Sequence, residues 1–245
     1  MIKDIKVIFN RELRGYFDTP VAYVFVAIFI LLSGIFTFYL GGFYESGQAD
    51  LAPFFMWHLW LYLFLVPAIS MRLWAEERRS GTIEFLNTLP ISTLDCVIGK
   101  FFAAWAFCAI ALFLTLPIWI TVNYLGDPDN GVIIAGYIGS LLSAGGFLAV
   151  GSCMSATTRN QVVAFVISIT VCFLFIVSGF PMVLDFFTGS GMPQLIIDMV
   201  SYFSFSVHFD DISKGIISIS SIIYFASFMA FWLFVTAVII DSKKA

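Results

Sequence analysis

Long apolar stretches alternate with short polar segments along the chain. Six stretches contain no Asp, Glu, Lys or Arg and are each at least 21 residues long: residues 19–44, 51–71, 101–126, 130–158, 160–184 and 215–240. A helix needs about 20 apolar residues to cross a hydrocarbon core of roughly 30 Å. The strict alternation typical of a membrane barrel is absent. The pattern therefore predicts six transmembrane helices, at about 20–40, 53–71, 97–122, 132–155, 162–179 and 216–240.

The segment before the first predicted span is amphipathic. Apolar residues recur there at helical spacing, namely Ile2, Ile5, Phe9, Leu13 and Tyr16. The basic residues occupy other faces of the helix, namely Lys3, Lys6, Arg11 and Arg14. This pattern predicts a helix over residues 2–17 lying flat in the membrane interface. The alternative is an ordinary amphipathic helix that faces solvent. Thr19-Pro20 then starts the first span, since proline is favoured at a helix start.

Residues 180–214 interrupt the pattern between the fifth and sixth predicted spans. The apolar stretches 186–197 and 199–209 are too short to cross a membrane, and Gly189, Gly191 and Pro193 interrupt them. Short segments of this kind are interfacial, or re-enter the membrane where other parts of the protein cover them. We expect such an outer segment here.

The fourth predicted span is rich in small residues, among them Gly136, Gly139, Gly145, Gly146 and Gly151. Small residues let helix backbones approach closely in lipid, so this pattern favours a tightly packed helix. A flexing helix beside a conduit is the alternative.

Composition and charge agree with a membrane protein. The chain is 60% hydrophobic and only 11% charged, far from the values of a soluble domain. With six spans, eleven of the twelve basic residues fall on one side of the membrane and only Lys214 falls on the other. The positive-inside rule makes the basic side cytoplasmic. We expect a single-domain, multi-pass protein (residues 1–245) of the inner (cell) membrane with both termini in the cytoplasm.

The sequence lacks recognisable catalytic or nucleotide-binding motifs. It has no phosphate-binding loop, no G-x-S-x-G elbow and no H-E-x-x-H pair. His208, Asp210 and Asp211 could in principle bind a metal ion, but one histidine with two adjacent acids is a weak ligand set. We expect these residues to lie in a solvated loop. The four cysteines have no CxxC spacing and are expected to pack as free thiols. No ionisable residue lies in the middle of a predicted span, so energy for any active transport would come from another subunit.

A charged insert follows the second predicted span. It reads "RLWAEERRSGTIEFLNTLPIS" over residues 72–92. Its apolar residues could fill a groove on a soluble partner, and its charged residues could pair with that partner or with anionic lipids. The stretch from Trp74 to Phe101 resembles the cytoplasmic coupling segment of ABC transporter type-2 permeases.

The resemblance extends over nearly the whole chain. It includes "RELRGYFDTPVAY", "LAPFFMW" and "RNQVVAF", and it is closest to the gliding-motility-type branch. It implies an all-α fold with an N-terminal interface helix, six transmembrane helices, a coupling helix between spans two and three (residues 72–95), and a re-entrant outer hairpin between spans five and six. It also implies that the chain is not itself an enzyme and has no cofactor of its own.

The resemblance further implies the partners and the site. A separate ABC ATPase would bind ATP and Mg, and a second permease half, identical or homologous, would complete the path; no nucleic acid is involved. The implied function is ATP-driven transport, in the direction of export. The alternative is a membrane scaffold or signalling subunit driven by the same kind of ATPase. The expected ATPase-coupling residues are Glu76, Glu77, Arg78, Gly81, Thr82, Ile83, Glu84, Phe85, Leu86, Leu89 and Pro90.

Overall fold

The computed structural model describes residues 2–82 and 91–243, and every regular element within them is a helix. The elements are α1 (Ile2–Phe17), α2 (Pro20–Ile35), the π-helix η1 (Phe36–Leu40), α3 (Phe43–Ser46), α4 (Ala52–Met56), α5 (His58–Ser70), α6 (Arg72–Ser80), α8 (Thr93–Phe113), α9 (Leu116–Leu125), α10 (Asn130–Thr157), α11 (Gln161–Val177), α12 (Pro181–Gly189), α13 (Gln194–Tyr202), α14 (Phe205–Ser213) and α15 (Ile219–Ser242).

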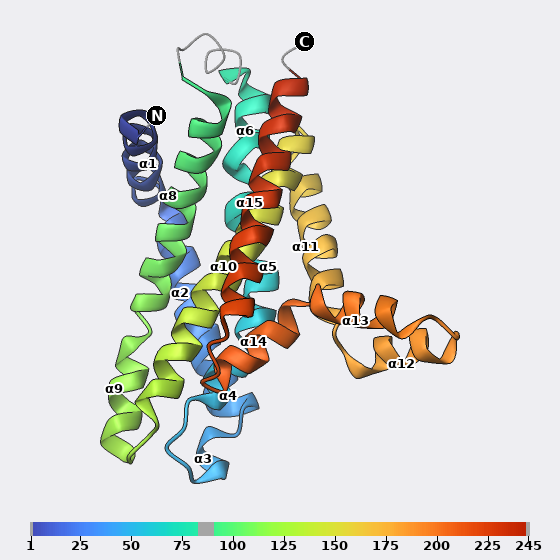
Figure 1. Cartoon of the computed structure of the whole chain (residues 1–245). Helices are drawn as coiled ribbons and strands as arrows, with labels where there is room; N and C mark the ends of the chain where they lie inside the picture. Colours follow the sequence, from blue (N-terminus) through green and yellow to red (C-terminus); the bar gives the residue numbers. More distant parts are fainter. Residues whose placement is uncertain (1, 83–90, 244–245) are drawn as a thin grey trace.

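The long helices run side by side along one axis (Figure 1). Among the described residues, five helical stretches are long and apolar enough to cross a membrane, and the bent pair α11–α12 could supply a sixth. This confirms a helical integral membrane protein. Both ends of the chain lie at the same end of the bundle, here called the termini end, and α3 and α4 lie at the opposite end, the far end (Figure 1).

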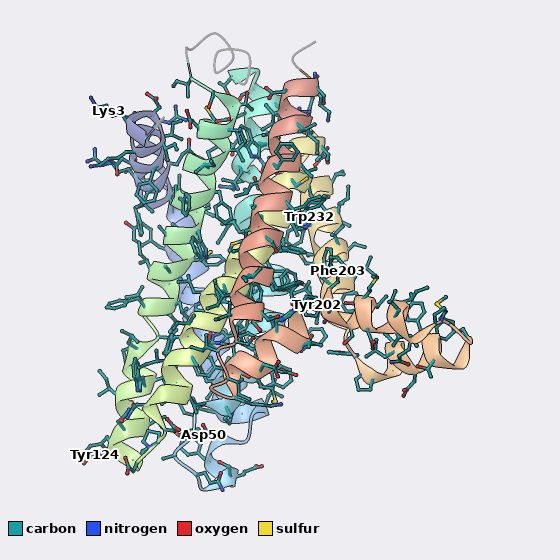
Figure 2. All side chains as sticks on the ribbon, viewed as in Figure 1. Lys3, Asp50, Tyr124, Tyr202, Phe203 and Trp232 are labelled. Atoms are coloured by element: carbon teal, nitrogen blue, oxygen red, sulfur yellow. The ribbon has the colours of Figure 1, made fainter. Side chains whose placement is uncertain are left out.

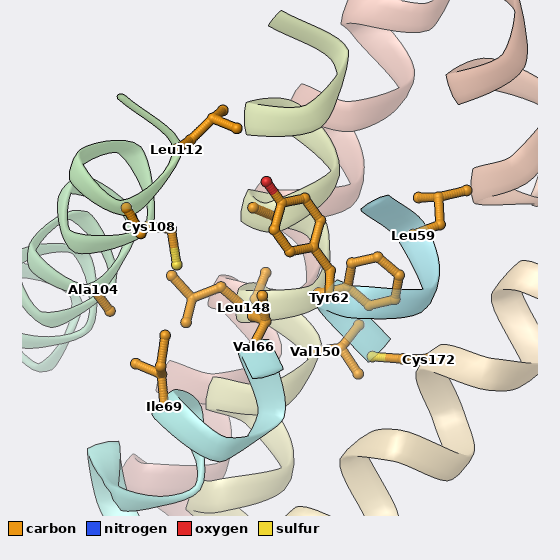
Figure 3. Packing of buried hydrophobic residues seen from close by; sticks show 14 of the residues in the cluster. Leu59, Tyr62, Val66, Ile69, Ala104, Cys108, Leu112, Leu148, Val150 and Cys172 are labelled. Atoms are coloured by element: carbon orange, nitrogen blue, oxygen red, sulfur yellow. The ribbon is translucent and has the colours of Figure 1, made fainter. Parts of the chain in front are cut away.

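Helix α10 forms the centre of the bundle and is fully buried along much of its length. Its glycines are in close contact with other helices: a methyl group at Gly146 would lie 2.6 Å from the ring of Phe205, and one at Gly139 would lie 2.7 Å from Ile212. Leu148 and Val150 pack against side chains of α5 such as Tyr62 (Figure 3). The small residues of this helix therefore serve close packing.

The first and third predicted spans are each built from two consecutive helices. Pro20 occupies the first turn of α2, and η1 extends this helix to Leu40. In the third span α8 and α9 together cover Thr93–Leu125, so the helical stretch is longer at both ends than the predicted 97–122. The cause at the start is Ser92, whose Oγ accepts a hydrogen bond from the Asp95 amide and caps α8.

Helix α1 packs lengthwise on α8. Ile8 fills the space above Gly99, where a methyl group would lie 2.8 Å from its side chain, and Tyr16 stacks on Phe107 with 5.1 Å between ring centroids. Its apolar face is thus covered in part by protein, and Lys3, Lys6 and Arg14 remain exposed. Its position flat in a membrane interface stays a prediction.

The segment between α11 and α15 contains three short helices. The chain bends by 73° between α11 and α12, and α12 and α13 form a hairpin that projects sideways from the bundle (Figure 1). The break between them lies inside the apolar stretch 186–197, because Gly191 has a φ of +71° and turns the chain there. Helix α14 returns to the bundle, where Phe205 stacks on Phe147 of α10 at 4.8 Å.

The expectation of a solvated loop around His208 is wrong. His208 lies on α14 with only 4% of its surface exposed. Its ring nitrogens lie 3.2 Å from Ser221 Oγ and 2.9 Å from the Tyr202 carbonyl oxygen, and its ring stacks on Tyr224 at 4.0 Å. The imidazole is therefore part of the packing between α14 and α15.

The four cysteines are buried and form no disulfide, as expected: Cys96, Cys108, Cys153 and Cys172. Cys108 and Cys172 lie within the apolar packing shown in Figure 3. They act as small apolar side chains.

Candidate functional site

The predicted coupling residues begin on α6, which continues α5 toward the termini end. The two helices meet at Met71 and together form one helical stretch, His58–Ser80. The part before Met71 is apolar, whereas α6 carries five charged residues in nine positions. A charged extension of a membrane helix is stable only where water or protein partners satisfy its charges. The partners of α6 therefore define this site.

Two serines of α10 hold the start of α6. Ser155 Oγ accepts hydrogen bonds from the backbone amides of Trp74 (3.1 Å) and Ala75 (3.0 Å) and donates one to the Met71 carbonyl (2.8 Å). The Trp74 indole donates to Ser152 Oγ at 3.1 Å. These bonds occupy backbone groups that the break at Met71 leaves without helical partners. They fix α6 to the centre of the bundle.

A buried lysine joins α6 to α1 and α8. Lys100 Nζ lies 2.7 Å from Glu77 Oε1 and 3.2 Å from Glu12 Oε1, and only 4% of the lysine side chain is exposed. The ammonium group also lies 5.2 Å from the centroid of the Trp74 ring. A buried ammonium is tolerated because carboxylates and an aromatic face surround it. Three helices, α1, α6 and α8, thus meet at one cation.

Glu12 is shared between two cations. Its Oε1 also accepts from Arg11 Nη2 at 2.6 Å. Burial acts to raise the pKa of Glu12, but the charges of Lys100 and Arg11 outweigh it and lower that pKa below its ordinary value. Glu12 is therefore ionised at neutral pH and keeps α1 attached to α8 and α6.

The end of α6 is defined by Gly81 and two hydroxyl groups. Gly81 has a φ of +73°, a left-handed conformation that favours glycine and ends the helix. Ser80 Oγ donates to the Glu76 carbonyl at 2.9 Å, and Thr82 Oγ1 donates to the Glu77 carbonyl at 3.3 Å. Helix α6 therefore ends at Ser80, and the break lies at Gly81.

The structure separates the predicted coupling residues into groups. Glu77 points inward to Lys100, so it pairs within the chain, whereas Glu76 is exposed. Arg78 is half-buried, and its Nε is buried without a hydrogen-bond partner. Six predicted residues lie outside the described part of the chain: Ile83, Glu84, Phe85, Leu86, Leu89 and Pro90.

The described residues on the other side of this segment are also fixed. Ser92 caps α8, and Thr93 Oγ1 donates to Asp241 Oδ1 of α15 at 2.6 Å. Residues 83–90 therefore connect two anchored helix ends, α6 and α8.

A cavity of about 370 Å³ opens beside the lysine. Both basic and acidic residues line it, among them Arg11, Glu12, Arg72, Glu76 and Glu77. Over residues 2–82 and 91–243, no group of three or more His, Cys, Asp or Glu side chains is close enough to hold a metal ion. The site offers ion pairs and hydrogen bonds that link α6 to α1, α8 and α10.

Sequence reasoning missed the residues that anchor α6. Trp74, Ser152, Ser155, Glu12 and Lys100 are not among the expected site residues. Trp74 stands out as a large aromatic residue within a charged stretch, and Lys100 as a cation beside an apolar run. Ser152 and Ser155 give no such signal, because serine is common in closely packed membrane helices.

Comparison with known proteins identifies the family of this chain. A search of curated proteins finds no match. The model of the family described as "ABC-2 family transporter protein" matches residues 7–242. This match includes α6, its anchors on α10 and the Lys100 ion pairs. The chain therefore belongs to the ABC-2 family of transporter proteins and is a membrane-spanning permease component of an ABC transporter.

Proposed function

We propose that this permease is one half of an exporter in the inner membrane, driven by a separate ABC ATPase that contacts α6 and residues 81–92. The observation that carries the proposal is the anchoring of α6, which joins a charged helix end to three different parts of the bundle. The family generally works with an ABC ATPase. ATP and Mg would be bound by that partner.

Two sets of contacts of α6, with the serines of α10 and with Lys100, could pass a movement of the coupling residues to the membrane helices. A push on residues 81–92 would move α6 as a unit, because Ser155 holds its start and Glu77 ties it to Lys100. The bonds from Ser155 and Ser152 would carry the movement to α10, which packs against α5, α8, α11, α14 and α15. The Lys100 pairs would carry it to α1 and α8.

The distribution of charge supports the proposed orientation. Of the described basic residues, all but Lys214 belong to α1, α6, the start of α8, the α10–α11 turn or the end of α15. Figure 2 labels Lys3 at the termini end, and Asp50 and Tyr124 at the far end. By the positive-inside rule the termini end faces the cytoplasm, where an ATPase would reach α6.

The second half of the path would come from an identical or homologous permease. The side chains that one copy leaves exposed along the bundle are largely apolar. An apolar path suits lipids, hydrophobic compounds or a polypeptide better than inorganic ions, because transferring an ion past apolar groups is unfavourable.

Copurification tests the coupling proposal. The double variant Glu84→Ala/Leu86→Ala removes a charge and an apolar contact from the proposed docking segment. We expect it to abolish copurification with the ATPase while membrane insertion stays normal, because the changed residues lie outside the predicted spans.

A matched control is Glu45→Ala/Leu40→Ala, which removes the same residue types at the far end. It should retain the ATPase. Equal retention by the docking variant would contradict the proposed contact, as would equal loss by the control.

A further inference from the structure

Four basic residues gather at the termini end of the bundle. They are Arg78 and Arg79 of α6, Arg159 of the α10–α11 turn, and Lys243 after α15, here called the basic cluster. Burial and the positive charges of Arg78 and Arg159 lower the pKa of Lys243. Like charges that come close enough to affect one another destabilise the cluster unless an anion joins them.

The described part of the chain supplies no such anion. Its salt bridges involve Arg11 and Lys100, and none involves a member of the basic cluster. Arg78 Nε is buried without a partner. Lys243 Nζ donates to the Thr157 carbonyl at 2.7 Å and so satisfies the C-terminus of α10. The C-terminus of α10 thus engages Lys243, whereas no hydrogen bond or salt bridge within residues 2–82 and 91–243 engages the side chains of the three arginines.

A cavity adjoins the cluster and opens at the start of α11. It has a volume of about 510 Å³ and is lined by Arg79, Thr158, Arg159, Asn160, Gln161 and Val162, with no acidic residue. The N-terminus of α11, a helix of 17 residues, adds the positive end of its dipole. Asn160 Oδ1 already accepts hydrogen bonds from the Val162 and Val163 amides at 2.9 and 3.5 Å, so the arginine side chains are the groups here that suit a phosphate.

An apolar surface begins next to this cavity. Val162, Val163, Val166 and Ile167 are exposed and, at spacings of one and four residues, share one face of α11. This face leads from the cavity into the part of α11 predicted to cross the membrane. A phosphate bound beside Arg159 would thus sit at the headgroup level of any lipid lying along α11.

We propose that the basic cluster binds the phosphate of an acidic phospholipid, whose acyl chains lie along the exposed face of α11. Anionic lipids are attracted to clusters of Lys and Arg next to membrane helices. The bound phosphate relieves the repulsion among the cations and ties α6 to the α10–α11 turn. The site goes beyond the proposed ATPase coupling and does not depend on it.

Lipid binding by the purified full-length chain tests this site. The protein in detergent is titrated with dioleoyl phosphatidylglycerol, and retained lipid is measured by native mass spectrometry. We expect Arg79→Gln/Arg159→Gln to weaken binding about tenfold, because each basic residue near an anionic headgroup contributes to its attraction. Both side chains are exposed, so the unfolding temperature without lipid should not change.

Three comparisons make the test specific. Lys3→Gln/Lys6→Gln removes the same charge from exposed positions on α1 and should keep phosphatidylglycerol affinity. Phosphatidylcholine, which carries no net charge, should bind more weakly than phosphatidylglycerol. Inorganic phosphate at equal concentration should compete poorly, since it lacks the acyl chains.

Four results would overturn the proposal: unchanged affinity in the arginine variant, equal loss in both variants, equal binding of the two lipids, or full displacement by inorganic phosphate. If the arginine variant keeps its lipid but loses the ATPase, the cluster is a protein interface instead.

Discussion

At the scale of single residues, Lys100 shows how protein groups can replace the water around a buried charge. Lysine is among the residues least often fully buried, yet Lys100 is covered by protein because two carboxylates and the Trp74 ring replace its water. Its removal would leave Glu12 and Glu77 without their shared cation. Both carboxylates keep some exposure to solvent, which moderates the effect.

We expect Lys100→Met to lower the free energy of unfolding by about 2 kcal/mol, the size typical for losing hydrogen bonds to charged groups. Thermal unfolding in detergent measures this. Adding Glu77→Gln to Lys100→Met should recover part of the loss, because one uncompensated charge is removed. Lys214→Met, at an exposed position, should have little effect. Equal stability of Lys100→Met and Lys214→Met would refute the role of the ion pairs.

At the scale of elements, the packing of α5 and α6 on α10 depends on small residues. Tyr62 OH of α5 lies 2.7 Å from Ser140 Oγ, and further along the same pair of helices Ser70 lies against Gly151. Beyond Met71 the same face of α10 presents Ser152 and Ser155 to α6. One row of small residues on α10 therefore positions both the membrane part and the charged part of this helical stretch.

Gly151→Ala tests this row. A methyl group at Gly151 would overlap with Ser70 Oγ and lie 2.7 Å from Ser70 Cβ. We expect a loss of about 1–3 kcal/mol, typical of overpacking, read as a lower unfolding temperature. The control is Gly34→Ala on α2, where no atom lies within 4 Å of the added methyl. If the two variants unfold at the same temperature, close contact at Gly151 is not important.

At the scale of the whole molecule, the two ends of the bundle differ in chemistry. The termini end holds α1, α6, the Lys100 site and the basic cluster, whereas the far end holds α3, α4 and acidic residues such as Asp50 (Figure 2). A bundle with this asymmetry has a preferred orientation, since basic residues are retained in the cytoplasm. The proposed coupling depends on this orientation.

Single introduced cysteines report the orientation in intact cells. The four native cysteines are buried, so they should contribute little labelling. Gln48→Cys at the far end should react with a membrane-impermeant maleimide in intact cells, and Lys3→Cys should react only after the cells are opened. The reverse pattern would place the termini outside and remove the basis for ATPase contact.

Features that depend on residues close together in the sequence could be predicted, whereas features that depend on residues far apart in the sequence could not. Thr19-Pro20 and the glycines of α10 could be interpreted from the sequence because they act through local backbone geometry or a regular pattern. The partners of Glu77 could not be identified, because Lys100 and Glu12 approach it only when α1, α6 and α8 meet. The environment of His208 was misjudged because its neighbours Asp210 and Asp211 suggested solvent, whereas α15 covers the ring.

The sequence alone determined that this chain is a bundle of membrane helices with one basic side and a charged insert after its second span. Helix length, apolarity and charge distribution are properties of consecutive residues, and the bilayer selects them directly. Only the tertiary structure decided which charges are shared, that Ser155 holds the start of α6, and that α12 and α13 leave the bundle. Those features depend on side chains brought together from distant parts of the chain, whose pairing no local pattern specifies.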